Sequence, residues 1–475
     1  MNELIGREKE VAELQRIVDS DKSEFVVIYG RRRIGKTFLV RKIFDDQFTF
    51  HYVGKHHKKK SEQLASFREV LIRQGASPEL PKFGSWGQAF GCLQQFLEKA
   101  GQGRKVIFFD EMPWMDSKGS DFVSELEYFW NSWASLRDDI IFIACGSATT
   151  WMHDKIEKNR GGLHNRITRK IYLRPFNLHE CELYLQKAGF DWDRYQIIQC
   201  YMIFGGVPYY LSLLLHQLSL QQNIDNLFFK RGASLNDEFT ELYNALYGKA
   251  DKYIKIVRLL SERKEGLTKK DIMKETGYSG GGLTTILNNL ERCDFVISYL
   301  QFGSKVKNTI YRLSDFYTRF YFKFVESSKT YDEQYWSHHF NDSGVLAWEG
   351  YSFEMVGLLH LDQIKKGLGI SGIATESSSW NYVPSEKGNN GFQIDLIIKR
   401  VDKIVHLCEL KFSENKYLIT KEYEKKLSER RRLFMEKTDI ARGVVYTFIT
   451  PAGLSDSSHN KLVHSQITTK ELFAE

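Results

Sequence analysis

The amino-acid sequence predicts an α/β protein assembled from several domains. At 475 residues the chain is too long for a single hydrophobic core, so three or four domains are expected. Apolar runs of strand length alternate with segments of helical spacing through residues 1–178. Two further strand-like runs lie within residues 392–412. These observations predict one sheet near the N-terminus and a second, separate sheet near the C-terminus.

The composition is that of a globular protein, with 42% hydrophobic and 27% charged residues. No apolar stretch approaches the roughly 18 residues of a membrane span, so none is expected. The six cysteines form no CxxC pair and several lie in apolar runs, which favours free thiols in a reducing cytoplasm. They are Cys92, Cys145, Cys181, Cys200, Cys293 and Cys408.

The formal net charge of +7 permits nucleic-acid binding without requiring it. Basic residues concentrate in three runs, at residues 56–60, 160–174 and 430–432. Each run is expected to be a solvated or phosphate-facing surface, and none is expected to contact base edges.

A glycine-rich loop follows the apolar run at residues 25–30, and a segment of helical spacing follows the loop. This is the GxxxxGK[ST] pattern of a P-loop in its strand–loop–helix context, and it predicts binding of ATP with Mg²⁺. Backbone N–H groups and the helix N-terminus are expected to surround the phosphates. Lys36 is expected to contact the β- and γ-phosphates, and the Thr37 hydroxyl to ligate Mg²⁺. The predicted nucleotide-binding residues are Gly30, Arg31, Arg32, Arg33, Ile34, Gly35, Lys36, Thr37 and Phe38.

Two later apolar runs end in polar residues at the expected ligand-binding edge of the sheet. Residues 105–111 end in Asp110, predicted to hold Mg²⁺, and Glu111, predicted to polarise the attacking water. Residues 140–146 lead into Ser147. Ser147 is expected either to contact the γ-phosphate or lytic water, or to cap the next helix, and both roles are compatible.

Residues 250–313 carry the pattern of a winged helix. Three helical segments precede a predicted hairpin whose wing contains Lys305 and Lys307. The third helix is expected to expose Thr284, Thr285, Asn288 and Asn289. Such side chains hydrogen-bond bases but attract phosphate little, so DNA binding and a spacer or protein-docking role both stay open.

Charged residues interrupt two apolar strands near the C-terminus. In residues 392–399, Phe392, Ile394, Leu396 and Ile398 are expected on one face and Asp395 on the other. In residues 404–412, Glu409 and Lys411 are two positions apart and share a face. Such charges are costly unless they pair or bind something, so either a Glu–Lys pair or a ligand site is expected.

Other segments resemble a known family of ATPases. The opening residues 4–8 (LIGRE) are similar to the entry motif of signal-transduction ATPases with numerous domains, and residues 204–211 (FGGVPYYL) resemble a signature of the archaeal-type members. The resemblance implies that Ile5 and Arg7 lie against the adenine and that Pro208, in a helical lid, contacts the nucleotide. Residues 161–166 (GGLHNR) resemble a segment ending in an arginine, which makes Arg166 the candidate sensor of the γ-phosphate, beside the alternative of an ordinary surface arginine.

The C-terminal pattern is similar to the core of restriction-endonuclease-like proteins. That resemblance implies that Asp395 and Glu409 hold a metal ion and that Lys411 helps to activate water. Residues 348–354 (WEGYSFE) resemble the N-terminal helix of that superfamily. Glu354 is therefore the candidate third catalytic carboxylate, with Glu349 as the second choice.

The predicted organisation is a P-loop ATPase domain at 1–178, a helical lid at 179–247, a winged helix at 248–330 and a restriction-endonuclease-like domain at 331–475. The leading hypothesis is a prokaryotic ATP-hydrolysing switch that controls DNA binding or cleavage by the C-terminal half. Two alternatives stay open: an ATP-gated protein-interaction scaffold with an inactive nuclease fold, and a DNA-binding regulator without cleavage. Double-stranded DNA and a protein partner are thus both candidate partners.

Overall fold

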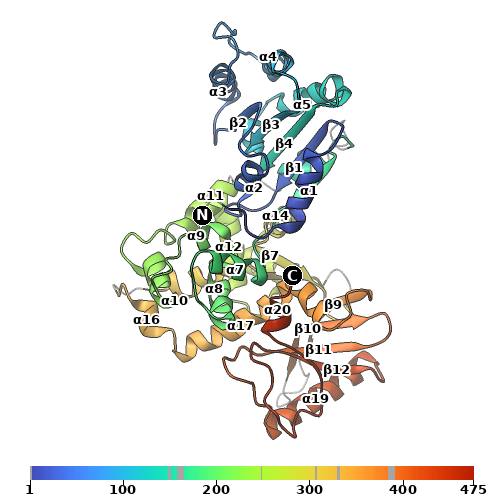
Figure 1. Cartoon of the computed structure of the whole chain (residues 1–475). Helices are drawn as coiled ribbons and strands as arrows, with labels where there is room; N and C mark the ends of the chain where they lie inside the picture. Colours follow the sequence, from blue (N-terminus) through green and yellow to red (C-terminus); the bar gives the residue numbers. More distant parts are fainter. Residues whose placement is uncertain are drawn as a thin grey trace. The chain divides into compact units, whose positions relative to one another are not determined.

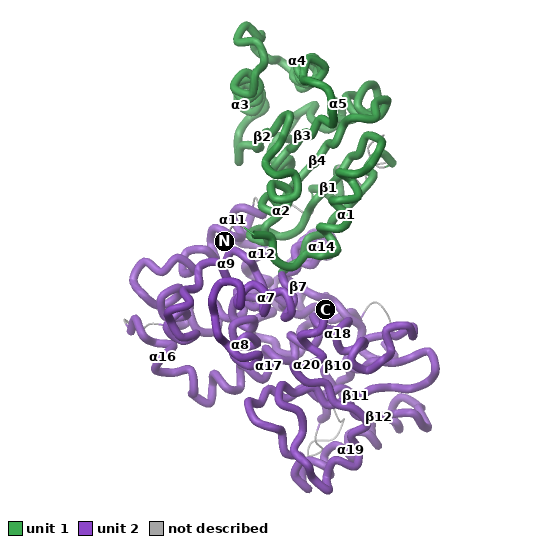
Figure 2. Tube along the Cα trace, viewed as in Figure 1, with its two compact units in different colours: residues 1–175 green, residues 176–475 purple. Residues whose placement is uncertain are grey.

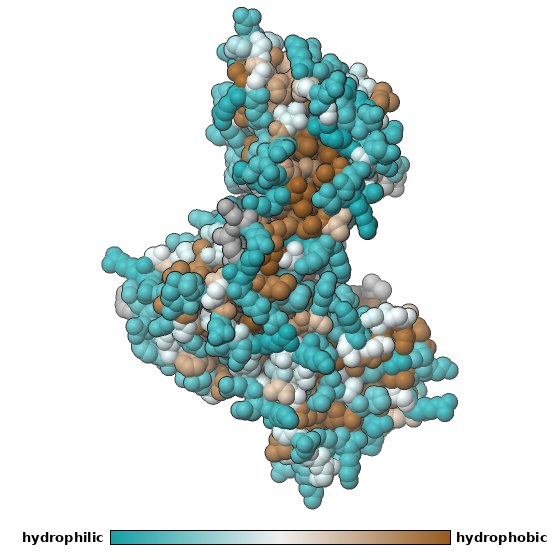
Figure 3. Space-filling model, viewed as in Figure 1, coloured by the Kyte–Doolittle hydropathy of each residue, from teal (hydrophilic) through white to brown (hydrophobic). Residues whose placement is uncertain are grey.

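The computed structural model divides the chain into two compact units, Met1–Pro175 and Phe176–Glu475 (Figure 2). Hydrophilic residues cover most of the face shown in Figure 3. Within the described ranges, no helix combines the length and apolar character needed to cross a bilayer. The structure describes residues 3–147, 151–157, 165–247, 249–304, 308–328, 332–382 and 391–475.

Unit 1 is built on a five-stranded sheet with the order β2-β3-β4-β1-β5, in which every neighbouring pair is parallel (Figure 1). This confirms the predicted α/β fold of the N-terminal part of the chain. The strands are β1 (Glu24–Tyr29), β2 (Phe50–Val53), β3 (Lys105–Asp110), β4 (Ile140–Gly146) and β5 (Arg169–Tyr172). The α-helices are α1 (Glu8–Val18), α2 (Lys36–Ile43), α3 (Lys60–Arg73), α4 (Trp86–Lys99) and α5 (Phe122–Ser132).

Both faces of this sheet are buried, as expected for parallel strands. Phe25 and Val27 of β1 pack with residues of α3, α4 and α5 in one core. Val26 and Ile28 point the other way and pack with residues of α1 and α2. The alternation along β1 therefore places helices on both sides of the sheet and leaves its edge at the strand ends for polar groups.

Unit 2 begins with short helices. Gly205, with φ of 65°, ends α8, and Pro208 lies in the first turn of α9. At Gly206 a Cβ atom would approach the Phe176 carbonyl oxygen to 2.1 Å, so only glycine fits there. The sequence FGGVPYYL thus has a structural function in ending one helix and starting another. The helices are α7 (Leu178–Lys187), α8 (Arg194–Phe204), α9 (Pro208–Ser212), α10 (Leu220–Ile224) and α11 (Glu238–Leu246).

A small three-stranded antiparallel sheet, β6-β8-β7, accompanies three helices in the region of the predicted winged helix. The Thr268 hydroxyl caps α13 by accepting from the Asp271 N–H, as its sequence suggests. Asn289 corrects one prediction, because it is buried and its amide donates to the Tyr253 hydroxyl. The elements are α12 (Ala250–Ser261), β6 (Leu267–Thr268), α13 (Lys269–Thr276), α14 (Gly280–Arg292), β7 (Val296–Tyr299) and β8 (Ile310–Leu313).

The last part of unit 2 contains a mixed sheet with the order β13-β12-β11-β10-β9. The pairs β9–β10 and β10–β11 are antiparallel, whereas β11–β12 and β12–β13 are parallel. The strands are β9 (Thr375–Tyr382), β10 (Phe392–Arg400), β11 (Val405–Leu410), β12 (Val444–Ile449) and β13 (Val463–Ile467). The helices from 316 onward are α15 (Phe316–Phe320), α16 (Tyr335–His339), α17 (Ser343–Leu359), α18 (Leu361–Gly367), α19 (Lys421–Thr438) and α20 (Thr469–Leu472).

A register irregularity in β10 corrects the predicted alternation. The pairing of β10 with β9 shifts between Ile394 and Ile397, a span that includes Asp395. Ile394 consequently packs in the core that α19 covers, whereas Leu396 packs in the core that contains α17. The two residues were predicted to share a face, and the irregularity separates them because an extra residue reverses the alternation.

His360 ties the start of unit 2 to its later helices. The side chain is 1% exposed and follows the end of α17. Its Nδ1 atom donates to the Val356 carbonyl, at 2.8 Å, and its Nε2 atom accepts from the Leu178 N–H, at 3.0 Å. This pattern requires the neutral ring. Burial lowers the pKa of His360 to about 4, although the Val356 carbonyl acts in the opposite direction.

We expect this buried histidine to make the fold acid-sensitive. Because its folded pKa lies below the value of 6.5 in the unfolded chain, its contribution is complete above pH 6.5 and is lost as the pH falls toward 4. The loss should be on the order of 3 kcal/mol. Urea unfolding of the full chain across this pH range should show a weaker pH dependence for His360→Asn than for the exposed control His216→Asn. Identical pH profiles would contradict this role.

Candidate functional site

The glycine-rich loop lies between the end of β1 and the start of α2. Gly30 has a φ of 151°, and a Cβ there would meet the Leu173 carbonyl oxygen at 2.1 Å. Gly35, with φ of 86°, precedes the first residue of α2, which is Lys36. The two glycines let the backbone curl around the N-terminus of α2, where N–H groups and the helix dipole attract anions.

Lys36 is directed into this loop and is 6% exposed. Its ammonium donates to the carbonyl oxygens of Gly30 and Arg31, at 3.0 and 2.8 Å. The positive charge is therefore held inside the curve of the loop, in the position from which a P-loop lysine contacts phosphate. Of the other predicted loop residues, Arg31 and Ile34 are buried, Arg32 and Arg33 are half-buried, and Phe38 is exposed.

The Thr37 hydroxyl and the Asp110 carboxylate meet at the edge of the sheet. Thr37 donates to Asp110 Oδ2 at 2.8 Å, linking the start of α2 to the end of β3. Burial raises the pKa of Asp110, an effect that the Thr37 hydrogen bond and the Lys36 charge oppose. A hydroxyl and a carboxylate together form an oxygen donor pair of the kind that Mg²⁺ prefers.

Glu111 adopts an unusual backbone conformation directly after β3, with φ of 46° and ψ of 44°. Left-handed backbone at a non-glycine residue is costly and is concentrated at functional positions. Its carboxylate accepts hydrogen bonds from the Ser147 hydroxyl, at 2.8 and 3.0 Å, and from the Ser147 N–H, at 3.2 Å. Residues 148–150, which would form the helix that Ser147 was proposed to cap, lie outside the described residues.

The entry segment lies against the loop. Arg7 is 5% exposed, and its guanidinium donates to the Ile34 carbonyl oxygen at 3.4 Å. Arg7 itself has a φ of 67° and precedes α1, while Ile5 is half-buried. The structure thus brings Arg7 to the loop that carries Lys36, and contact of Ile5 and Arg7 with adenine stays a prediction.

Two other predicted nucleotide contacts lie in different parts of the chain. Arg166 is exposed, shortly before β5, and residues 161–164 of its motif lie outside the described residues. Pro208 belongs to unit 2 and is half-buried in the first turn of α9. Their roles toward a nucleotide stay predictions.

In unit 2, Glu354 and Asp395 are both within reach of the same arginine. Arg312 of β8 donates to Glu354 Oε2 at 3.0 Å, and its Nη1 atom lies 4.0 Å from Asp395 Oδ1. Lys264 approaches the other Glu354 oxygen, at 3.3 Å. Burial and the Asp395 charge raise the pKa of Glu354, while Arg312 and Lys264 lower it. Arg312 was not predicted from the sequence. It is a charged residue inside the apolar strand IYRL, and a charged residue inside an apolar strand is the signal that pointed to Glu409.

Glu409 lies in a separate set of contacts. Its carboxylate pairs with Lys411 at 2.9 Å and with Arg430 of α19 at 2.6 Å, and it also accepts from the Tyr423 hydroxyl. Burial raises the pKa of Glu409, but the charges of Lys411 and Arg430 outweigh burial, so the pKa lies below its usual value. Glu349, the second choice for the helix glutamate, accepts from the Gln199 amide at 2.8 Å. Desolvation raises the pKa of Glu349 to about 7.

The structure therefore places the C-terminal candidates in basic surroundings. Across the described ranges, no three His, Cys, Asp or Glu side chains are arranged to hold a metal ion. The predicted Glu409–Lys411 pair is present. The shared metal site of Asp395 and Glu409 stays a prediction.

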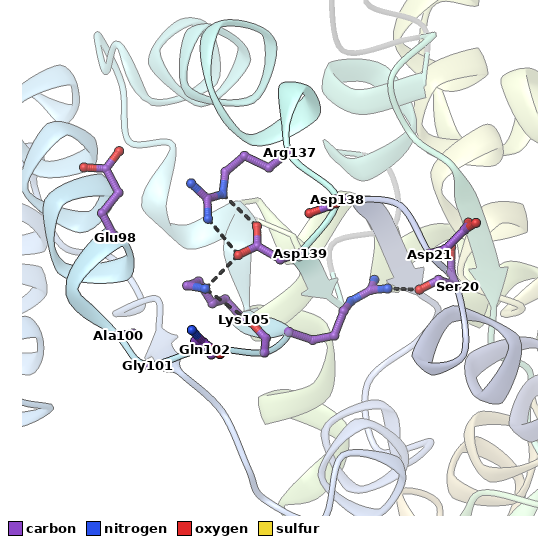
Figure 4. A pocket seen from close by; sticks show the side chains of 12 residues that line it. Ser20, Asp21, Glu98, Ala100, Gly101, Gln102, Lys105, Arg137, Asp138 and Asp139 are labelled. Atoms are coloured by element: carbon purple, nitrogen blue, oxygen red, sulfur yellow. Dashed lines mark hydrogen bonds and ion pairs between the residues drawn. The ribbon is translucent and has the colours of Figure 1, made fainter.

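A pocket of about 680 Å³ opens at the opposite edge of the unit 1 sheet, near the starts of β3 and β4. Figure 4 shows Arg137 and Lys105 directed toward Asp139 there. Lys105 Nζ and Arg137 Nε each lie 2.7 Å from an Asp139 carboxylate oxygen. The pKa of Asp139 lies well below its usual value. The largest cause is hydrogen bonding from Arg137, and the hydrogen bond from Lys105 acts in the same direction. This network fixes the beginnings of the strands, and the nucleotide loop lies at their other ends.

Comparisons with known proteins identify similar chains from archaea. The chain is 24% identical over 328 residues to an uncharacterised protein of Methanocaldococcus jannaschii, covering 68% of each. An uncharacterised ATP-binding protein of the same organism is 35% identical over 43 residues, which are 9% of this chain and 73% of that protein.

Solved structures with a partial likeness include two other archaeal proteins. A Walker-type ATPase of Pyrococcus abyssi has a TM-score of 0.48 and 16% identity, covering 67% of this chain and 96% of that one. The ORC2 protein of Aeropyrum pernix has a TM-score of 0.40 and 17% identity, covering 66% and 90%.

The model of one protein family covers the nucleotide loop, Asp110, Glu111, Ser147 and the FGGVPYYL segment. Its match extends over residues 4–214, and the family is described as an ATPase domain predominantly from Archaea. Residues 4–214 of this chain therefore resemble an archaeal-type ATPase domain.

Proposed function

We propose that this protein is a magnesium-dependent, ATP-hydrolysing switch that controls the action of its second unit on DNA. The observation that carries the ATP-hydrolysing part is the meeting of Lys36, the Thr37–Asp110 pair and Glu111 at one edge of a parallel sheet. Binding, metal ligation and activation of water each have a residue of suitable chemistry at this edge.

Each residue has a defined part in the proposed reaction. Thr37 and Asp110 would hold Mg²⁺, which supplies positive charge to the phosphate oxygens when bound. Lys36 binds the β- and γ-phosphates from inside the loop. Glu111 orients and polarises the attacking water. Ser147, which holds the Glu111 carboxylate through three hydrogen bonds, positions this base.

Three further nucleotide contacts are proposed, each from a separate observation. Arg7 reaches the loop through the Ile34 carbonyl, which supports a place for Ile5 and Arg7 near the nucleotide base. Arg166 is exposed and available to a ligand, which is compatible with a sensor of the γ-phosphate. For Pro208, the support is the family match over its segment.

The DNA-directed part of the proposal is supported by residues 250–313. A winged helix consists of three helices and a small antiparallel sheet, and α12–α14 with the β6-β8-β7 sheet match this set of elements. The third helix, α14, is the one expected to enter the DNA major groove. Thr285 and Asn288 are exposed on α14 and can hydrogen-bond DNA. The wing residues Lys305 and Lys307 lie outside the described residues, and their contact with phosphate stays a prediction.

The ion pairs of the C-terminal carboxylates favour control of DNA binding without DNA cleavage. The carboxylates of Glu354, Asp395 and Glu409 are matched by the cations of Arg312, Lys264, Lys411 and Arg430. A metal ion bound by these carboxylates would have to compete with those side chains. The ion pairs therefore favour a role of the C-terminal region in binding or docking, with DNA cleavage as the alternative.

The first test separates ATP binding from hydrolysis. Lys36→Ala should abolish nucleotide binding, because the loop loses the charge that balances the phosphates. Glu111→Gln should bind ATP but turn it over about 10²- to 10⁴-fold more slowly, the usual contribution of a positioned base. Lys42→Ala, which removes an exposed lysine from the same helix, is the matched control. Wild-type turnover by Glu111→Gln would exclude it as the base.

A second test concerns the buried Arg312. Arg312→Met should destabilise unit 2 by about 3–5 kcal/mol, because Glu354 and Asp395 would lose their shared partner. Adding Glu354→Gln and Asp395→Asn to Arg312→Met should recover most of the loss, since the unpaired charges are then removed. Urea midpoints of the full chain measure both effects. If Glu354 and Asp395 bind a metal ion, Mn²⁺ should raise the urea midpoint of Arg312→Met but not that of the triple variant.

The third test addresses DNA. Replacing Lys305 and Lys307 by alanine should weaken DNA binding by the full chain. The plot of log K against log salt should become less steep by about one unit per lysine. Fluorescence anisotropy over a salt series, with and without ATP, measures this slope and its dependence on nucleotide. An unchanged slope would remove the wing from the interface, and affinity independent of ATP would contradict the switch.

A further inference from the structure

A strongly basic segment follows β2 at the same edge of the sheet as the nucleotide loop. Residues 55–60 read Lys-His-His-Lys-Lys-Lys, and they are called the basic loop below. Residues 55–59 are exposed, and Lys60 begins α3. Because β2 and β3 are parallel neighbours, the basic loop leaves the sheet beside Asp110 and Glu111.

Of the four lysines of the basic loop, two are paired with carboxylates and two have no such pair among the described residues. Lys58 pairs with Glu62 at 2.8 Å, and Lys60 pairs with Asp121 at 2.9 Å. Within the described part of the chain, Lys55 and Lys59 have no ion pair. The N-terminus of α3, a helix of 14 residues, adds its positive dipole end to the same place.

Aromatic rings lie beside these lysines. The His56 ring contacts the Trp114 ring at a centroid distance of 4.7 Å and the His57 ring at 3.8 Å. Burial, followed by the charges of His57 and Arg32, lowers the pKa of His56, which favours its uncharged ring near neutral pH. Proteins bind single-stranded nucleic acids by combining exposed aromatic rings, on which bases stack, with basic side chains that contact phosphates.

The buried amide of Gln63 fastens the basic loop to the segment that follows Glu111. Gln63 is 0% exposed, and its amide nitrogen donates to the carbonyls of Lys55, at 2.5 Å, and Trp114, at 2.7 Å. Its amide oxygen accepts from the Lys55 N–H at 3.1 Å. A displacement of Lys55 is therefore transmitted to the Trp114 backbone through one side chain.

Gly54 forms a second connection, on the other side of Lys55. Its N–H donates to the Asp110 carbonyl at 2.9 Å. A Cβ atom at Gly54 would lie 2.5 Å from the Glu111 carbonyl oxygen, so the two backbones are in close contact. The residue immediately before the basic loop thus touches the strand end that carries both the candidate metal ligand and the candidate base.

We propose that the basic loop binds the phosphate backbone of single-stranded nucleic acid and that this binding changes the rate of ATP hydrolysis through Gly54 and Gln63. Nucleic acid is favoured over an acidic protein because the exposed rings of His56 and His57 accompany the lysines and offer flat surfaces to bases. Only the effect on ATP hydrolysis rests on the proposed function, and the binding step is independent of it.

Binding is tested with two variants of the full chain that remove equal charge. Lys55→Ala with Lys59→Ala alters the basic loop, whereas Lys22→Ala with Lys99→Ala removes two exposed lysines near the opposite edge of the sheet. With a labelled DNA single strand, the first variant should bind roughly 10- to 100-fold more weakly at about 0.1 M salt, and its salt slope should fall by about 1.4. The second variant should match the wild type. Equal affinities of the two variants would overturn the proposal.

Coupling is tested by ATP turnover with and without the same DNA. The wild type should change its turnover when DNA is added, and the Lys55→Ala, Lys59→Ala variant should keep the basal rate and lose the change. Gln63→Met should retain DNA affinity but respond less, because its link to Trp114 is removed. A full response in the Lys55→Ala, Lys59→Ala variant would overturn the coupling. Absence of all ATP turnover would refute the proposed function and leave the binding test standing.

Discussion

Charged side chains that lie below the surface need partners, and this requirement shapes both units of the protein. In unit 1 the ammonium of Lys36 is bonded to loop carbonyls, and the Asp110 carboxylate is bonded to the Thr37 hydroxyl. These bonds fix a cation and an anion at the strand ends before any ligand arrives. Such a prepared arrangement of charge costs no reorganisation when phosphate and a cation take complementary positions.

In unit 2 the same requirement is met entirely by protein side chains around the carboxylates discussed above. Arg312 lies beside Glu354 and Asp395, while Lys411 and Arg430 lie beside Glu409. Arg312 comes from the small antiparallel sheet and Glu354 from α17, so their ion pair also joins two parts of unit 2. These charged side chains pair across different elements of unit 2, and the metal site that the sequence suggested there stays a prediction.

The sequence predicted local features well because each is encoded within a few residues. The strand, loop and helix around Lys36 and the Glu409–Lys411 pair are of this kind. The contact of Ser147 with Glu111 was not predicted, because it depends on β4 packing next to β3. The register shift near Asp395 was not predicted either, because one extra residue in a strand does not change the amino-acid composition recognisably.

The helices that open unit 2 have partners that come much later in the chain. Leu178 bonds to His360, Gln199 bonds to Glu349, and Arg194 donates to the Thr469 carbonyl. Contacts separated by 150 to 275 residues are slow to form, because a long loop must close before they stabilise anything. During synthesis we therefore expect α7 and α8 to stay incompletely packed, with apolar surface exposed to chaperones, until α20 has left the ribosome.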